Sequence, residues 1–145
     1  MKIISSAFQH QQTIPDKYTC KGDDVNPPLQ FLEVPDNAQS LVLLVDDPDA
    51  PSGTWDHWVV FNIEPRTLGI EEDSMASSGT EGKNSWGNMS YGGPCPPSGT
   101  HRYFFKLYAL DKLLDINDDS DKKTVEKAMQ GHIIDTAELI GLVSK

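Results

Sequence analysis

Short apolar stretches separated by turn-forming residues dominate the pattern of this chain. The stretches are rich in β-branched and aromatic residues and are bounded by proline, glycine, asparagine or aspartate. This pattern is typical of β-strands joined by turns. The clearest predicted strands are Leu41–Val45, Trp58–Ile63 and Tyr103–Leu110, and weaker ones are Ile3–Phe8, Leu29–Leu32 and Leu139–Val143.

The stretch Tyr103–Leu110 is apolar on both of its predicted faces. A strand that is covered on both faces belongs in the middle of a sheet, so we expect a central position for it. One face would hold Tyr103, Phe105, Leu107 and Ala109, and the other Phe104, Tyr108 and Leu110.

A single helix is predicted near the end of the chain. Ser120 or Asp121 can cap it, and Gly131 weakens its end. The order of elements is many strands followed by one helix, with no βαβ alternation, which favours an antiparallel β-sandwich with a peripheral helix. The helical spacing continues through Val125, Ala128, Met129 and His132 or Ile133.

Length and charge limit the number of domains and the classes of partner that the chain can have. The 145 residues fit one domain, residues 1–145. Twelve basic and 22 acidic residues give a net charge of −10, so the chain has no basic surface for a nucleic acid or an anionic membrane. A small anion bound in a local pocket remains compatible with this charge.

No targeting or membrane segment is evident. The longest aliphatic run, Leu41–Val45, is far shorter than the roughly 18 residues that cross a bilayer, and the first residues turn polar too early for a signal peptide. We therefore expect cytoplasmic residence. Cys20 and Cys95 allow one disulfide at most, and in that compartment we expect a reduced pair.

Two loops have unusual composition. The connection Glu64–Thr100 is long for a compact domain, where such loops commonly build a site. Its end, Tyr91–Thr100, contains three prolines that limit backbone freedom and leads directly into the best strand. The other loop, Asp46–Pro51, follows the strand Leu41–Val45. Each loop is well placed to hold a ligand beside a strand.

Ionisable side chains gather at the ends of predicted strands, where they would meet if the strands are neighbours. A histidine that is bound by a carboxylate is a good donor to an anion, because the charge favours the protonated ring. The backbone N–H groups of the Pro94–Pro97 turn would add donors. The side chains concerned are Asp46, Asp47, Asp49, His57, His101, Arg102 and Tyr103.

Simpler interpretations apply to the same residues. Asp47 and Asp49 can cap turns, His57 and His101 can be buried core residues, and Arg102 can pair with a loop aspartate. Trp55, Trp58 and Tyr103 are more often core aromatics than a stacking platform.

Catalytic alternatives lack their usual patterns. Two histidines and an aspartate can bind zinc or iron, but the spacing has no HExxH motif. Ser98 and Cys95 lie near His101 without a recognised nucleophile context. We expect no metal, no cofactor and no catalytic residue.

Several motifs in this order resemble the phosphatidylethanolamine-binding protein family, in the short bacterial and archaeal branch often called Raf-kinase-inhibitor-like proteins. The match covers nearly the whole chain, and its most specific parts are Asp47-Pro48-Asp49-Ala50-Pro51 and Gly93-Pro94-Cys95-Pro96-Pro97 followed by His101-Arg102-Tyr103. Further matches are Tyr18-Thr19-Cys20-Lys21-Gly22, Asn26-Pro27-Pro28-Leu29, His57-Trp58-Val59-Val60-Phe61-Asn62-Ile63 and Ala128-Met129-Gln130-Gly131-His132-Ile133.

The resemblance implies a Greek-key β-sandwich with a small pocket for phosphate-like or carboxylate-like anions, including the phosphoethanolamine head group. Asp49 and Arg102 would have supporting roles. The short link Ser98–Thr100 would reshape one pocket wall, and the chain ends before the C-terminal element of longer eukaryotic members. The resemblance assigns the pocket to Asp47, His57, Cys95, Pro96, His101 and Tyr103.

Three interpretations of function follow. The first is a non-enzymatic protein that binds a small anionic or phosphorylated ligand: a phosphoethanolamine head group, a nucleotide or a phosphorylated side chain. The second is an inhibitor or regulator that contacts a serine protease or kinase through its proline-rich loops, as relatives are described to do. The third is a hydrolase built on the histidine–aspartate cluster. Relatives in this branch often dimerise, so a homodimer is left open.

Overall fold

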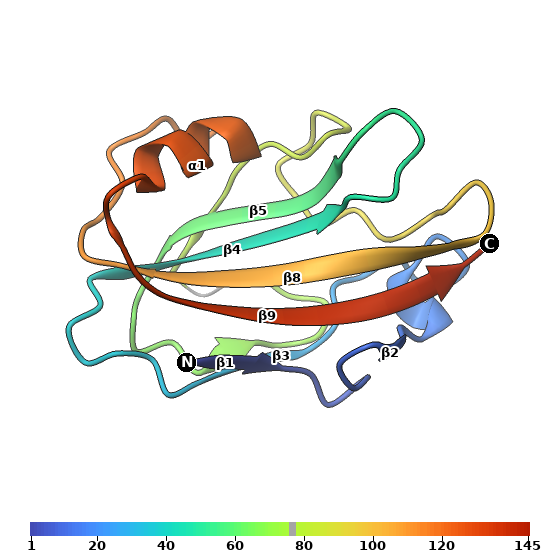
Figure 1. Cartoon of the computed structure of the whole chain (residues 1–145), viewed down its shortest axis with the longest axis horizontal. Coiled ribbons are helices and arrows are strands. Elements are labelled where there is room, and N and C mark those ends of the chain that lie inside the picture. The colour runs from blue at the N-terminus through green and yellow to red at the C-terminus, as the bar shows by residue number, and fades with distance from the viewer. Residues whose placement is uncertain (76–77) are drawn as a thin grey trace.

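Two β-sheets pack face to face in the computed structural model, which describes residues 1–75 and 78–145, and one helix covers the outer face of the larger sheet (Figure 1). The smaller sheet has the strand order β1 (Lys2–Ile4), β3 (Leu29–Leu32) and β6 (Gly69–Ile70). The larger has the order β2 (Gln12–Thr13), β9 (Ile133–Ser144), β8 (Thr100–Leu110), β4 (Ser40–Asp47), β5 (Trp55–Ile63) and β7 (Thr80–Glu81).

The strand order confirms the predicted Greek-key β-sandwich. The strands β4, β5, β7 and β8 follow one another within the larger sheet, since β6 belongs to the smaller one. They lie in the spatial order β8, β4, β5, β7, because the chain leaves β7 and returns to pair beside β4. The prediction of wholly antiparallel sheets is wrong at one edge, since β2 pairs with β9 in parallel. The strand β2 consists of two polar residues, so it has no apolar stretch from which the sequence could predict it.

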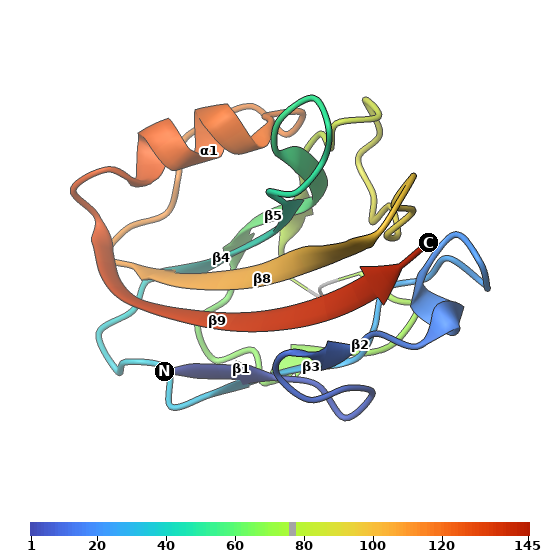
Figure 2. The same ribbon diagram turned by 45° about the vertical axis from the view of Figure 1, so that its right-hand side comes forward.

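The main core lies between the two sheets, which Figure 2 shows as separate layers below the helix. Strand β4 is buried along its whole length because both of its faces are covered. Leu43 and Val45 face the smaller sheet, and Val42 and Leu44 face the helix. Strand β8 is central, as predicted, but its second face is only partly covered, since Phe104 and Tyr108 are half-buried.

The predicted helix forms as α1 (Lys122–Met129) and rests on β4 and β5 through Val125 and Met129. Asp121 caps it by accepting a hydrogen bond from the Thr124 N–H at 3.0 Å. The helix ends earlier than the spacing predicts, because Gly131 adopts a positive φ of 80° and turns the chain into β9. His132 and Ile133 therefore lie outside the helix.

Most other predicted strands form with altered lengths. The prediction Leu139–Val143 recovers only the end of β9, because the start of this strand alternates polar, partly exposed residues such as Asp135 with apolar ones. The prediction Ile3–Phe8 shortens to β1. The long connection Glu64–Thr100 contains the two short strands β6 and β7, and its residues 76–77 lie outside the described part.

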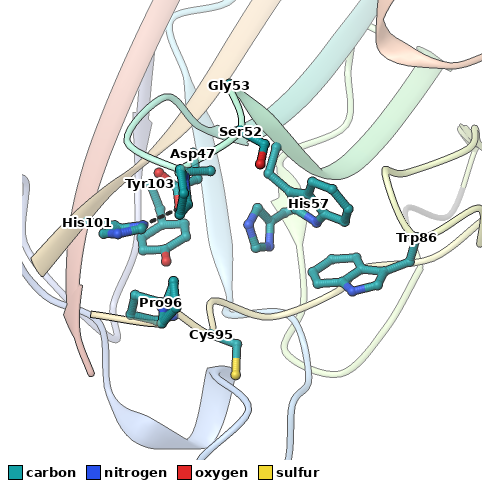
Figure 3. A pocket seen from close by; sticks show the side chains of 13 residues that line it. Asp47, Ser52, Gly53, His57, Trp86, Cys95, Pro96, His101 and Tyr103 are labelled. Carbon is teal, nitrogen blue, oxygen red and sulfur yellow. Dashed lines mark hydrogen bonds and ion pairs between the residues drawn. The ribbon is translucent and has the colours of Figure 1, made fainter. Parts of the chain in front are cut away.

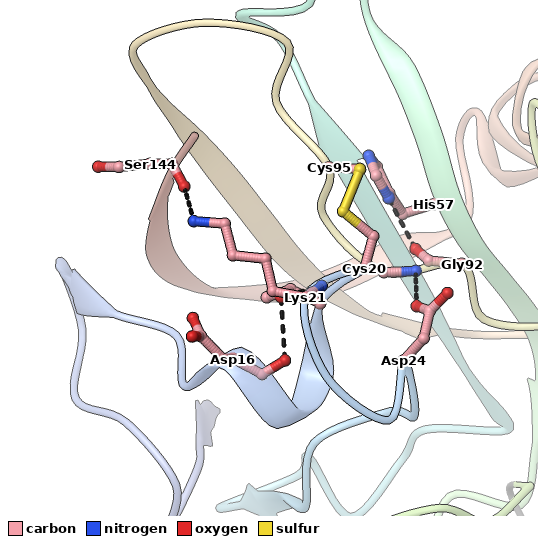
Figure 4. The surroundings of a disulfide bond; sticks show 10 residues. Asp16, Cys20, Lys21, Asp24, His57, Gly92, Cys95 and Ser144 are labelled. Atoms are coloured by element: carbon pink, nitrogen blue, oxygen red, sulfur yellow. Dashed lines mark hydrogen bonds between the residues drawn. A yellow bond between two sulfur atoms is a disulfide. The ribbon is translucent and has the colours of Figure 1, made fainter.

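Cys20 and Cys95 form a disulfide, with their Cα atoms 5.4 Å apart (Figure 4). The expectation of a reduced pair is wrong for this structure. That expectation was based on the predicted compartment. It could not take account of the fold, which brings the loop after Tyr18 against the loop before β8.

No helix among the described residues is long and apolar enough to span a membrane.

Candidate functional site

A pocket of about 330 Å³ opens where β4 ends and where β5 and β8 begin (Figure 3). All six residues that the sequence analysis assigned to an anion pocket line it. The structure therefore brings together side chains that are up to 56 positions apart in the sequence, from Asp47 to Tyr103. The complete lining is Asp47, Ala50, Pro51, Ser52, Gly53, Trp55, His57, Trp86, Cys95, Pro96, Pro97, His101 and Tyr103.

Asp47 connects the ends of two neighbouring strands. It is the last residue of β4 and is only 3% exposed. Its Oδ2 lies 2.7 Å from Nδ1 of His101 on β8, and its Oδ1 accepts a hydrogen bond from the Asp49 N–H at 2.8 Å. A carboxylate only accepts hydrogen bonds, so Nδ1 of His101 carries a proton. Nε2 is then the ring nitrogen of His101 that is left for a ligand.

A β-bulge directs His57 toward the pocket. Val45 on β4 pairs with Trp58, but the next residue, Asp46, pairs with Asp56, so His57 is an extra residue without a partner on β4. A bulge bends the strand and changes the direction of a side chain. His57 therefore contacts Tyr103, at 5.2 Å between ring centroids, although Trp58 already occupies the core face.

A backbone carbonyl fixes the tautomer of His57. Nδ1 of His57 lies 2.7 Å from the Gly92 carbonyl oxygen (Figure 4). Because a carbonyl can only accept, the proton of the neutral ring is on Nδ1 and the lone pair is on Nε2. Burial lowers the pKa of His57, outweighing the Gly92 hydrogen bond and the charges of Asp47, Asp46 and Asp56, which raise it.

The Tyr103 hydroxyl is a buried donor that is free to bind a ligand. It has no hydrogen-bond partner among the described residues, and in Figure 3 it points toward Pro96. Burial, followed by the charge of Asp47, raises the pKa of the phenol well above its ordinary value. The group therefore stays protonated and can donate. A buried hydroxyl without a partner is costly, and an anion in the pocket would satisfy it.

Asp49 and Arg102 form a paired rim beside the pocket and do not line it. Asp49 accepts hydrogen bonds from Nε and Nη2 of Arg102, each at 2.9 Å, and from the Arg102 N–H. These bonds lower the pKa of Asp49 to about 2. The interpretation of Arg102 as a partner for a loop aspartate is confirmed.

Asp46 does not join the cluster, which corrects the expectation that all the loop carboxylates meet. Successive side chains of a strand point to opposite faces, so Asp46 points away from Asp47, toward α1. It lies 2.9 Å from Nζ of Lys106 and 3.1 Å from Nζ of Lys122, which also pairs with Asp56 at 2.8 Å. This buried group ties the helix to the sheet.

The loop before β8 is bound firmly up to Cys95. Gly93 N–H donates to Asp24, Cys20 N–H donates to the Pro94 carbonyl, and the Tyr91 hydroxyl donates to the Tyr18 carbonyl. The disulfide follows directly, so the Cys95 sulfur is bonded to Cys20 and points away from the cavity (Figures 3 and 4). Cys95 and Pro96 thus contribute a stiff wall without a free thiol.

Two tryptophans, Trp55 and Trp86, also belong to the pocket lining. Trp55 is therefore a pocket residue and not a core residue, and Trp86 was not among the residues predicted from the sequence. Trp86 lies in the long connection before β8. A tryptophan among small polar residues, in Asn84-Ser85-Trp86-Gly87-Asn88, was the available signal.

No group of three or more histidine, cysteine, aspartate or glutamate side chains in residues 1–75 and 78–145 is arranged to hold a metal ion. The polar side chains of the pocket lining include two imidazoles, one carboxylate, one phenol and the hydroxyl of Ser52. Their chemistry suits hydrogen bonding to a compact oxyanion.

Comparison with known proteins gives a consistent result. A family model described as phosphatidylethanolamine-binding protein matches residues 4–144. A UPF0098 protein of Methanothermobacter thermautotrophicus is 48% identical, with 98% of this chain and 97% of the relative covered. A UPF0098 protein of Pyrococcus horikoshii is 45% identical over 98% of this chain and 76% of the relative.

Solved structures agree over the whole chain. A phosphatidylethanolamine-binding protein homologue from Chlamydia trachomatis has a TM-score of 0.95 and 42% identity, covering 99% of this chain and 97% of that one. The YbcL protein of Escherichia coli, described as a new member of the mammalian family, has a TM-score of 0.91 and 26% identity, covering 99% and 98%.

Proposed function

Because the chain belongs to the phosphatidylethanolamine-binding protein family, we propose that it is a non-enzymatic binding protein whose pocket receives the phosphate group of a small molecule, a lipid head group or a phosphorylated side chain. The proposed binding residues are Asp47, His57, Cys95, Pro96, His101 and Tyr103, with Asp49 and Arg102 in support.

The observation that supports this proposal most directly is the orientation of the two imidazoles. In both His57 and His101, Nδ1 is bound to a protein acceptor, so a ligand can only use Nε2. An imidazolium donates from both nitrogens. When both rings are protonated, the pocket offers two charged N–H donors and the Tyr103 hydroxyl. These donors match the ionised oxygens of a phosphate group, which accept hydrogen bonds.

Asp47 has two opposite effects on an anion in the pocket. Its negative charge neutralises a protonated His101 at 2.7 Å, but it also repels an anion. Proton uptake by the pocket resolves this conflict. His57 is kept neutral by burial in the free protein, and the charge of an arriving phosphate favours its protonation. The complex then contains one imidazolium more than the free protein.

The net charge of −10 is consistent with such a site. A phosphate polymer would be repelled by this net negative charge, whereas a single phosphate group in the pocket meets the local donors. The cavity of about 330 Å³ is large enough for a phosphate with a substituent. Several hydrogen-bond donors converge on this cavity. No side chain in its lining pairs with a general base as an activated nucleophile does.

Titration calorimetry with inorganic phosphate and phosphoethanolamine tests the proposal. Wild-type protein should bind both ligands. The variants His57→Ala and His101→Ala should each weaken binding at least tenfold, since each removes a charge-assisted hydrogen bond. The control variant Arg66→Ala, which removes an exposed cation outside the pocket lining, should bind normally. Absence of saturable heat with either ligand would refute it.

The same histidine variants also test the alternative that the protein inhibits a protease through a protein interface. Inhibition of a serine protease that persists in the His57→Ala, His101→Ala double variant would show that the pocket is not the functional surface. Turnover of a phosphomonoester by the wild type, lost in the double variant, would contradict a purely binding role.

A further inference from the structure

The disulfide joins one wall of the pocket to the loop after Tyr18. Cys95 lines the pocket, and its sulfur is bonded to Cys20 on the side away from the cavity (Figures 3 and 4). Both cysteines are exposed residues, and both line a second cavity of about 350 Å³. A dissolved reductant can therefore reach the bond without entering the pocket. Exposed disulfides are in general easier to reduce than buried structural ones, and they are often regulatory.

The chain before Cys95 is fixed without the disulfide. The Gly92 N–H donates to the His57 carbonyl oxygen at 2.9 Å, and the Gly92 carbonyl oxygen lies 2.7 Å from Nδ1 of His57. The Pro94 carbonyl oxygen accepts a hydrogen bond from the Cys20 N–H at 3.0 Å. None of these bonds involves a sulfur atom, so we expect this part of the loop to keep its position when the disulfide is reduced.

The chain after the disulfide has no such support. Residues 95–98 form no hydrogen bond with any residue in the described part of the chain, and Pro96 and Pro97 have no N–H to donate. The next backbone contact is at Gly99, whose carbonyl oxygen accepts from the Lys145 N–H at 3.0 Å. Within the described residues, the disulfide is thus the one bond that anchors this segment between its two ends.

This segment borders the donors that are proposed to bind phosphate. Pro96 lies beside the Tyr103 hydroxyl (Figure 3), and Pro97 also lines the pocket. The chain then enters β8, where His101 contributes its imidazole. A wall that moves must be ordered again whenever a ligand binds, and ordering a mobile segment lowers the affinity.

We propose that the disulfide between Cys20 and Cys95 is a redox switch, whose reduction by a dithiol weakens phosphate binding about threefold to tenfold. The inference rests on the proposed function and adds a means of regulating the same site. In the reaction, a thiolate of the reductant attacks one sulfur and forms a mixed disulfide, which the second thiol of the reductant resolves. The reductant loses two electrons and two protons and becomes a disulfide, and the two cysteines become thiols.

The coupling must also act in the opposite direction. If reduction weakens phosphate binding by a given factor, bound phosphate makes the disulfide harder to reduce by the same factor. Protein equilibrated with mixtures of reduced and oxidised dithiothreitol gives the fraction of reduced disulfide, which alkylation of the free thiols and mass spectrometry measure. Saturating inorganic phosphate should shift this equilibrium about threefold to tenfold toward the disulfide, equal to the change in affinity.

The direct test is titration calorimetry with inorganic phosphate on the oxidised and the fully reduced wild type. The variant Cys20→Ser breaks the disulfide without changing a pocket residue. The matched control is Met129→Ala, which shortens a 2% exposed side chain beneath α1 and lowers stability far from the disulfide. Circular dichroism shows whether each sample is folded.

Oxidised wild type and Met129→Ala should bind phosphate equally well. Reduced wild type and Cys20→Ser should be folded and bind about threefold to tenfold more weakly, and reoxidation should restore the wild-type affinity. Equal or higher affinity after reduction would overturn the switch and leave the phosphate pocket intact. An equal weakening in Met129→Ala, or unfolding of the reduced protein, would also overturn it, because a switch needs two folded states with different affinities. Failure of phosphate to bind oxidised wild type would refute the proposed function itself.

Discussion

Oδ2 of Asp47 lies 2.7 Å from Nδ1 of His101, which joins the end of β4 to the start of β8 across 54 positions of sequence. Both side chains are buried. The pair fixes the orientation of the imidazole and supplies the charge that would neutralise it when protonated. In the proposed site, Asp47 would therefore act on an anion through His101 as well as directly, and the two effects would have opposite signs.

The variant Asp47→Asn tests which of the two effects is larger. The asparagine removes the repulsion of an anion, but it also replaces the charge-assisted hydrogen bond to Nδ1 of His101 with a weaker neutral one. We expect phosphate binding to weaken, because the His101 ring is then held less firmly with Nε2 available to the ligand. Calorimetry at neutral pH measures this.

Asp111→Asn is the matched control for Asp47→Asn, since Asp111 pairs with His132 at 2.8 Å outside the pocket lining. It should leave phosphate binding unchanged. An unchanged affinity in Asp47→Asn would contradict the role of this carboxylate.

Phosphate binding should take up protons. Burial lowers the pKa of His57, so its ring is neutral in the free protein at neutral pH, and a bound anion favours the charged ring. Affinity should therefore fall as pH rises through the pKa that His57 has in the complex. Calorimetry in buffers with different ionisation enthalpies should give an uptake of about one proton per phosphate. Identical heats in all buffers would contradict this coupling.

The rim pair of Asp49 and Arg102 should make a small, acid-sensitive contribution to stability. The pKa of Asp49 is lowered from 3.8 to about 2. Such a group stabilises the fold above its unfolded pKa and loses this effect as pH falls toward its folded pKa, so the window lies between about pH 4 and pH 2.

Because the pair is largely exposed to solvent, Asp49→Asn should cost no more than about 1 kcal/mol at neutral pH. Urea unfolding at pH 7 and at pH 2 measures both values. The cost should nearly vanish at pH 2, and a cost that is the same at both pH values would show that the carboxylate charge is not responsible.

The disulfide should stabilise the fold substantially. Cys20 and Cys95 are 75 positions apart, and closing a loop of that length in the unfolded chain corresponds to about 4 kcal/mol in the chain-entropy account. Urea unfolding with and without a reductant should show a loss of this size.

The double variant Cys20→Ala, Cys95→Ala controls for effects of the reductant. It should unfold like the reduced wild type and should not respond to the reductant. A wild-type midpoint that is unchanged by complete reduction would contradict the predicted contribution.

Apolar patterning predicted the sandwich because alternation and turn residues act locally. Leu29–Leu32 forms β3 as predicted, and the cap at Asp121 starts α1. The patterning could not predict the bulge at His57, since a bulge depends on the pairing of two strands that are apart in the sequence. The direction of the His57 side chain, and with it the arrangement of the pocket, follows from that pairing.

The other missed features also depend on long-range contacts. Trp86 reaches the pocket because a buried Asn84 closes its loop and Gly92 leaves room for the ring. The pairing of Cys20 with Cys95 depends on two loops meeting in space. By contrast, the motifs around Asp47 and His101 were sufficient to name residues that line the pocket, because each motif keeps its residues at the end of one strand.

The most direct test of the proposed phosphate site is nitrogen-15 NMR of the histidine side chains during titration with inorganic phosphate at neutral pH. We predict saturable shifts of Nε2 in both His57 and His101, with the His57 signals moving from the Nδ1–H tautomer to the doubly protonated ring. Both histidines should give the same dissociation constant. Unchanged Nε2 signals at phosphate concentrations that saturate the calorimetric binding would contradict the account.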